Sequence, residues 1–175
     1  MRGPRLHKSI AFVAVAAIVL VLDRLGKRAA VSELEVGARI PLVGELLSFA
    51  RIETTEVALG LFQDWGERGP HVAFAVLSIF CVLLVLLFYR GLARGEHGSA
   101  AALGAILAGV LSNAWDRYES GVGLAFLHLG APDAAHLPDF SLAELAILLG
   151  VVTLIVELLA HEMAARVQER PPRTR

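Results

Sequence analysis

A carboxylate and a guanidinium stand side by side at the end of an apolar stretch, where membrane helices usually carry no charge. Asp116 and Arg117 follow the apolar run from Ser99 to Trp115, and Asn113 lies one helical turn earlier. Ionisable groups inside a span are costly and usually face a bundle interior or a polar cavity. A second carboxylate, Glu144, stands near the start of the next apolar run. These side chains are therefore the first candidates for chemistry.

Asp116 and Glu144 together could perform acid–base catalysis. If their two apolar runs are antiparallel neighbours, both carboxyls lie at similar depth near the outer membrane interface. Two carboxyls at close range cannot both ionise, so one activates a water while the other protonates the scissile amide. Each group also has a plainer interpretation. Ser141 to Glu144 fits a helix capping box, and Asp116 with Arg117 could be an interfacial ion pair.

The composition places the chain among membrane proteins. Of its 175 residues 56% are hydrophobic, and the mean hydropathy is +0.64, which is too apolar for an ordinary soluble domain. The net charge of -1 offers no basic field for nucleic acid. Cys81 is the single cysteine, and the six histidines lack ligand spacing. We therefore expect no internal disulfide, no metal and no other cofactor.

Four apolar stretches predict an all-α membrane fold with spans at residues 9–29, 71–90, 99–116 and 139–161. The apolar core of the first stretch is short, and its basic start would also fit a cleaved signal peptide. No small-x-small cleavage site follows at the expected place, which favours an uncleaved span. A transporter or channel is disfavoured because the sequence shows no inverted repeat or broken helix.

The basic residues predict how the spans are oriented. They gather in the amino-terminal segment, in the loop at 90–94 and in the tail, which puts both termini in the cytoplasm. Residues 30–70 then form an outer-face segment, where 38–42 and 46–52 are typical of short strands. We expect a small β-element there, within a single domain of residues 1–167. The charged tail, 168–175, is expected to be disordered.

From about residue 10 to residue 160, the chain resembles the bacterial lipoprotein signal peptidase (signal peptidase II) family. Asp23-Arg24-Leu25-Gly26-Lys27 resembles the family's Asp-Gln-x-Thr-Lys. Ala108-Gly109-Val110-Leu111-Ser112-Asn113-Ala114-Trp115-Asp116-Arg117 resembles its Gly-Gly-x-x-Gly-Asn-x-x-Asp-Arg. Pro138-Asp139-Phe140-Ser141-Leu142-Ala143-Glu144 resembles its Pro-x-Phe-Asn-x-Ala-Asp. The order, spacing and membrane placement of the three segments agree.

The resemblance implies a membrane aspartic endopeptidase in which Asp116 and Glu144 are the catalytic pair. Its substrates would be prolipoproteins whose cysteine carries diacylglyceryl, cut just before that cysteine, and globomycin-type inhibitors would compete. The enzyme would lie in the bacterial inner membrane among its lipids, with the site near the outer face. The residues implied to bind or orient the substrate or the pair are Asn113, Arg117, Asp23, Lys27, Thr54, Glu56 and Ser141.

Several positions depart from the family pattern. The second catalytic aspartate falls on Glu144, and the asparagine before it falls on Ser141. The family's Asn-x-Gly-Ala-Ala-Phe falls on residues 54–59, where Glu56 is either a substitute carboxylate or a solvated loop residue. The aspartate of its Val-Val-Asp-Phe loop falls on Ala125. Two functions therefore stay open: a working peptidase, or a catalytically impaired relative that binds signal peptides or an inhibitor without cleaving.

Overall fold

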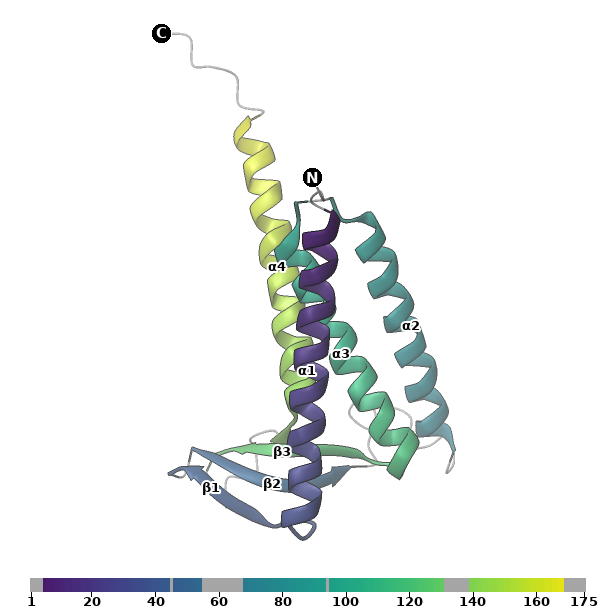
Figure 1. Ribbon diagram of the computed structural model, residues 1–175, viewed down its shortest axis with the longest axis vertical. Coiled ribbons are helices and arrows are strands. Elements are labelled where there is room, and N and C mark those ends of the chain that lie inside the picture. Colours follow the sequence, from purple (N-terminus) through teal and green to yellow (C-terminus); the bar gives the residue numbers. More distant parts are fainter. Residues whose placement is uncertain (1–4, 45, 55–67, 94, 131–138, 169–175) are drawn as a thin grey trace.

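The computed structural model describes residues 5–44, 46–54, 68–93, 95–130 and 139–168. Its four helices are α1 (Arg5–Glu33), α2 (Gly69–Gly91), α3 (His97–Ser120) and α4 (Leu142–Gln168). All four are long and apolar enough to cross a membrane, as the sequence predicts. Figure 1 shows them as an elongated bundle, with the ends of α1 and α3 meeting a small sheet.

The helix α3 forms the centre of the bundle. Half of the residues in its most apolar 18-residue segment are buried. Close approach to its neighbours depends on glycine. A side-chain carbon added at Gly104 would overlap the Phe12 carbonyl of α1, and one at Gly109 would overlap the Ala143 carbonyl of α4. In contrast, α2 buries only Ser78 and Val85, so most of its apolar surface is left to face lipid.

The sheet has four antiparallel strands in the order β1-β2-β3-β4. The strands are β1 (Arg39–Val43), β2 (Leu47–Thr54), β3 (Gly123–Leu129) and β4 (Asp139–Phe140). The hairpin of β1 and β2 confirms the predicted β-element. The sequence did not predict β3 and β4, which come from the connection between the third and fourth spans. Two segments far apart in the chain thus build one sheet (Figure 1).

One boundary needs correction. Residues 139 and 140 were assigned to the fourth span, but they form β4 and α4 begins at Leu142. Two interactions account for this. His128 and Asp139 pair in register across β3 and β4, and Ser141 caps the helix that follows. The apolar Phe140 therefore belongs to the sheet, although it adjoins the apolar run of α4.

A row of polar side chains links three of the four strands. The guanidinium of Arg39 donates to His128 Nε2 at 2.9 Å, and His128 Nδ1 lies 2.6 Å from Asp139 Oδ1. Since arginine can only donate, His128 Nε2 accepts and the ring proton is on Nδ1. The imidazole therefore donates to Asp139. This buried histidine connects the edge strand β1 to the strand that leads into α4.

Candidate active site

Asp23 and Lys27 lie one turn apart on α1, and both are almost fully buried. The Lys27 ammonium lies 2.7 Å from Asp23 Oδ2 and 2.6 Å from Asp116 Oδ2, and it donates to Asn113 Oδ1 at 3.0 Å. The contact with Asp116 is an ion pair without hydrogen-bond alignment. A buried charge is tolerated only when it is paired and hydrogen-bonded. The partners of Lys27 meet that condition.

Asp23 joins three helices. Its Oδ2 accepts a hydrogen bond from Ser112 Oγ of α3 at 2.6 Å, and its Oδ1 accepts the backbone N–H of Ala143 in α4 at 2.7 Å. The amide of Ala143 belongs to the first turn of α4, where backbone N–H groups have no partner within the helix. Asp23 supplies that partner. Ser112 stands where the family motif has glycine, and its role was not predicted from the sequence.

Arg24 is a second residue that the sequence analysis did not single out. Its Nη1 lies 2.5 Å from Asp116 Oδ1, and its Nη2 donates to Glu119 Oε2 at 2.9 Å. Glu119 also accepts from the Trp115 indole at 2.8 Å. Asp116 is thus held by Arg24 on one oxygen and Lys27 on the other. The available signal was Arg24 in place of the family's glutamine, three residues before Lys27 on one helical face.

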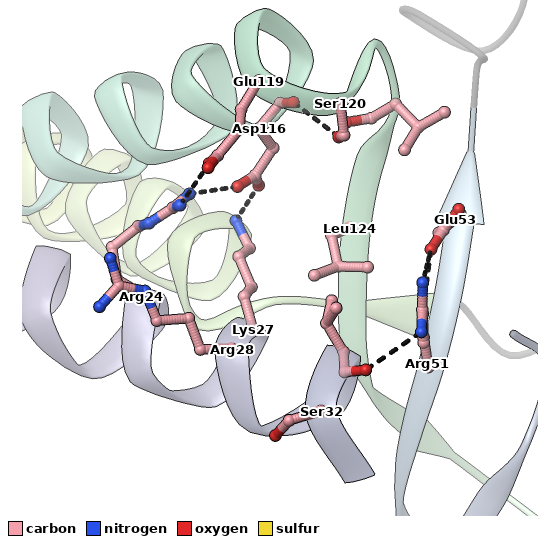
Figure 2. Close-up of a pocket in the computed structure, with 12 residues that line it drawn as sticks. Arg24, Lys27, Arg28, Ser32, Arg51, Glu53, Asp116, Glu119, Ser120 and Leu124 are labelled. Carbon is pink, nitrogen blue, oxygen red and sulfur yellow. Dashed lines mark hydrogen bonds and ion pairs between the residues drawn. The ribbon is translucent and has the colours of Figure 1, made fainter. Parts of the chain in front are cut away.

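Figure 2 shows the cavity that opens beside these groups, between the ends of α1 and α3 and the strands β2 and β3. Its volume is about 320 Å³. The Asp116 carboxylate points toward Arg24 and Lys27 at one side of it, and Arg51 pairs with Glu53 at the other (Figure 2). Nine of its twelve described lining residues are polar or charged, and they carry both signs of charge.

Ser141 and Glu144 form the capping box that the sequence allowed as an alternative. The backbone N–H of Ser141 donates to Glu144 Oε2 at 2.9 Å, and the N–H of Glu144 lies 3.3 Å from Ser141 Oγ. Ser141 is fully buried, whereas Glu144 is exposed. The carboxyl of Glu144 is therefore held at the start of α4 by a backbone amide and remains open to its surroundings.

Arg117 lies on a different face of α3 from Asp116, because consecutive helical residues are turned by about 100°. Its guanidinium carbon lies 4.5 Å from the ring centroid of Phe74 in α2. The guanidinium also interacts electrostatically with the carboxylates of Glu144 and Asp116. Among the described residues, the partners of Asp116 are on α1 and α3, and no contact joins its carboxyl to that of Glu144. The pairing of the two carboxyls stays a prediction.

The remaining sites of the sequence analysis lie around Arg117 or outside the described residues. Thr54 ends β2 and pairs in register with Gly123 of β3. A side-chain carbon at Gly123 would lie 3.0 Å from Arg117 Nη2. Ala125, two residues further along β3, is buried. Glu56 lies outside the described residues.

The chain is similar to known proteins over most of its length. The sequence profile of the family described as Signal peptidase (SPase) II matches residues 15–160. The lipoprotein signal peptidase of Geobacter sulfurreducens is 30% identical over 86% of this chain and 92% of its own length. That of Pseudomonas aeruginosa strain UCBPP-PA14 is 28% identical over 82% of this chain and 85% of its own length.

A solved structure shares the fold. It is described as a bacterial membrane enzyme studied by the in meso method at 2.3 Å resolution, and it superposes with a TM-score of 0.76 at 18% identity. The superposition covers 94% of each chain. The profile match spans most of the chain and includes all three motif segments, which meet at the end of the bundle next to the sheet. The chain therefore belongs to the signal peptidase II family.

Proposed function

We propose that this chain is a membrane aspartic-type endopeptidase that removes signal peptides from prolipoproteins carrying diacylglyceryl on cysteine. Membership of the signal peptidase II family supports this function and the enzyme class. The relatives, which share the name lipoprotein signal peptidase, support cleavage over the alternative of a non-cleaving binder. Globomycin-type inhibitors are expected to compete with the substrate.

The observation that carries the proposal is the meeting of three distant motif segments. Lys27 of α1 reaches Asp116 of α3, and Asp23 of α1 reaches Ala143 of α4, next to Glu144. Buried polar networks of this size are costly in a membrane bundle and usually serve function. The network holds the outer ends of the three helices in one arrangement.

In this proposal Asp116 and Glu144 supply the two carboxyls. The Asp116 carboxylate is held between the cations of Arg24 and Lys27, and it is the base that takes a proton from water. Glu144 then gives a proton to the leaving amide nitrogen. Its carboxyl must leave the Ser141 amide to do so, and its exposure allows that movement. Catalytic contacts commonly tighten only when substrate is bound.

Arg117 is proposed to orient the substrate between the two carboxyls. Its guanidinium interacts electrostatically with both carboxylates and lies over the ring of Phe74. Arginine keeps its charge and offers several donors in a fixed plane, so it suits the carbonyl oxygens of a peptide or an ester. Asn113, Asp23 and Lys27 support this arrangement through their shared contacts, and Ser141 holds the start of α4.

We propose that the protein lies in the bacterial inner membrane, with both termini in the cytoplasm and the sheet at the outer face. In support, Lys8 near the start of α1 donates to the Leu92 carbonyl after α2 at 2.7 Å. Figure 1 shows the start of α1 and the end of α2, which belong to the two basic segments, at the bundle end away from the sheet. Residues 1–167 would form one domain, followed by a disordered tail.

The test is cleavage of a diacylglyceryl prolipoprotein by the purified protein in detergent. Asp116→Asn and Glu144→Gln each remove one carboxyl, and glutamine can still form the capping box. Both variants are expected to lose activity by at least about a hundredfold. Glu162→Gln, on the exposed surface of the same helix as Glu144, is the matched control. No cleavage by the native chain despite substrate binding would support the non-cleaving alternative.

A further inference from the structure

A second cavity lies between α2 and α3, on the side of α3 away from the Asp23 and Lys27 cluster. Its volume is about 420 Å³, within the usual range of small-molecule pockets, roughly 300–1,000 Å³. The described residues that line it are His71, Phe74, Ala75, Ser78, Ile79, Ala114, Arg117 and Tyr118. Phe74 and Arg117 are in contact at 4.5 Å, so the cavity adjoins the proposed site.

The cavity follows one face of each helix. On α2 the lining residues recur every three or four positions from His71 to Ile79, which is the spacing of one helical face. The eight steps from residue 71 to residue 79, at a rise of 1.5 Å each, give a depth of roughly 12 Å along the membrane span. On α3 the lining ends with Arg117 and Tyr118, near the outer end of the helix.

The residues that line the cavity are more polar at its outer end than at its deeper end. The deeper part is lined by Ala75, Ser78 and Ile79 of a helix that otherwise faces lipid. The outer part holds the Arg117 guanidinium and the His71 imidazole, whose Nε2 lies 3.1 Å from the Gly121 carbonyl. Apart from the Ser78 hydroxyl, the donors lie at the outer end of this open groove. Such a groove suits an amphiphile whose chains lie in the membrane and whose ester carbonyls lie at the interface.

We infer that this cavity holds an acyl chain of the diacylglyceryl group on the substrate cysteine. This inference rests on the proposed function, and it deepens it by giving the lipid its own place beside the reacting peptide. With the chain between α2 and α3, the ester carbonyls reach the Arg117 end. The cysteine then lies near Glu144, which interacts electrostatically with Arg117. The lipid thereby sets the position of the peptide bond that is cut.

The test is photo-crosslinking in nanodiscs with a diacylglyceryl lipobox peptide that carries a diazirine in one acyl chain. The label is expected on α2 between His71 and Ile79 and on α3 near Ala114. Ala75→Phe fills the cavity and should weaken peptide binding about tenfold, since burial of roughly two methylenes is lost. Val76→Phe adds the same ring at the neighbouring position, which is exposed like Ala75 but does not line the cavity, and should leave binding within about twofold.

Two outcomes would overturn the inference. One is equal binding by Ala75→Phe and Val76→Phe. The other is labelling by diazirine phosphatidylcholine of the same residues to the same extent, which would mean that bulk lipid fills the cavity. Binding is measured without cleavage, so the inference can hold even when the native chain does not cut the peptide. Cleavage with unchanged binding in Ala75→Phe would leave the proposed function intact and remove the inference.

Discussion

The Asp23 carboxylate of α1 accepts the backbone N–H of Ala143 in α4 at 2.7 Å, across 120 positions of the chain. The same carboxylate pairs with Lys27, whose ammonium also lies against Asp116. One acidic residue therefore ties the start of α4 to the ends of α1 and α3. Because Glu144 directly follows Ala143, the depth of Glu144 in the membrane is set through Asp23.

Replacing Asp23 by asparagine is expected to destabilise the protein strongly. Asparagine keeps an acceptor for Ala143 but removes the charge that faces Lys27, and breaking a buried ion pair costs about 3–5 kcal/mol. The measurement is the thermal unfolding midpoint in detergent, compared at one scan rate because membrane proteins often unfold irreversibly. A double variant with Lys27→Met should lose less than the sum of the two single losses. Additive losses would show that the pair is not coupled.

Arg24→Gln, which introduces the residue of the family motif, is expected to lower kcat roughly tenfold with little change in KM. It removes the charge-assisted contact at 2.5 Å to Asp116, a type of bond worth about 1.5–3 kcal/mol. Arg28→Gln is the matched control, because Arg28 lines the same cavity but is exposed. Equal effects of the two changes would mean that Arg24 acts only through the overall charge of the cavity.

The helices and the first hairpin could be predicted because their signals are local. Apolar runs give the spans, and two turn glycines with positive φ bound the first strand: Gly37 precedes β1, and Gly44 lies between β1 and β2. The seven-residue strand β3 was missed, and so was its partner β4, which has two residues and adjoins an apolar helix. Short strands of this kind are specified by pairing with distant segments, which no local pattern records.

The site was predicted in part. The motif positions Asp23, Lys27, Asn113 and Asp116 do meet. Their partners Arg24 and Ser112 could not be recognised, because a lone arginine or serine at a helix end usually has only a local role. Spacing also suggested that Asp116 and Glu144 face each other at one depth. In the structure the two adjacent residues contact different helices: Asp116 contacts α1, and Arg117 contacts α2.

Glu144→Asp restores the family residue and tests the length of the side chain. Aspartate is shorter by one methylene, so its carboxyl moves by roughly 1.5 Å, and misplacement of about 1 Å can change a rate about a hundredfold. If Glu144 is positioned by the present surroundings, the change should lower cleavage. A rise in cleavage would instead show that the glutamate is the suboptimal group. Melting curves serve as the control, since the cap to Ser141 is altered as well.

Ala125→Asp places a carboxyl where the family's Val-Val-Asp-Phe loop carries one. Side chains two residues apart on a strand share a face, and Gly123 faces the Arg117 guanidinium and Thr54. The new carboxyl is therefore expected to lie beside Arg117, whose guanidinium also interacts electrostatically with Glu144. We expect cleavage to rise at least about tenfold, since a positioned acid or base contributes about 10²–10⁴ in rate and the new group starts without its own supporting contacts.

Combining Ala125→Asp with Asp116→Asn separates two assignments of the second carboxyl. If Asp116 is the partner of Glu144, the double variant is inactive, because the carboxyl held by Arg24 and Lys27 is gone. If the double variant cleaves as well as Ala125→Asp alone, the partner belongs on β3, and Asp116 serves to hold α1 against α3. Thermal unfolding of each variant shows whether the buried carboxyl at position 125 is tolerated. The measurement thus assigns Asp116 either to the chemistry or to the positioning of the helices.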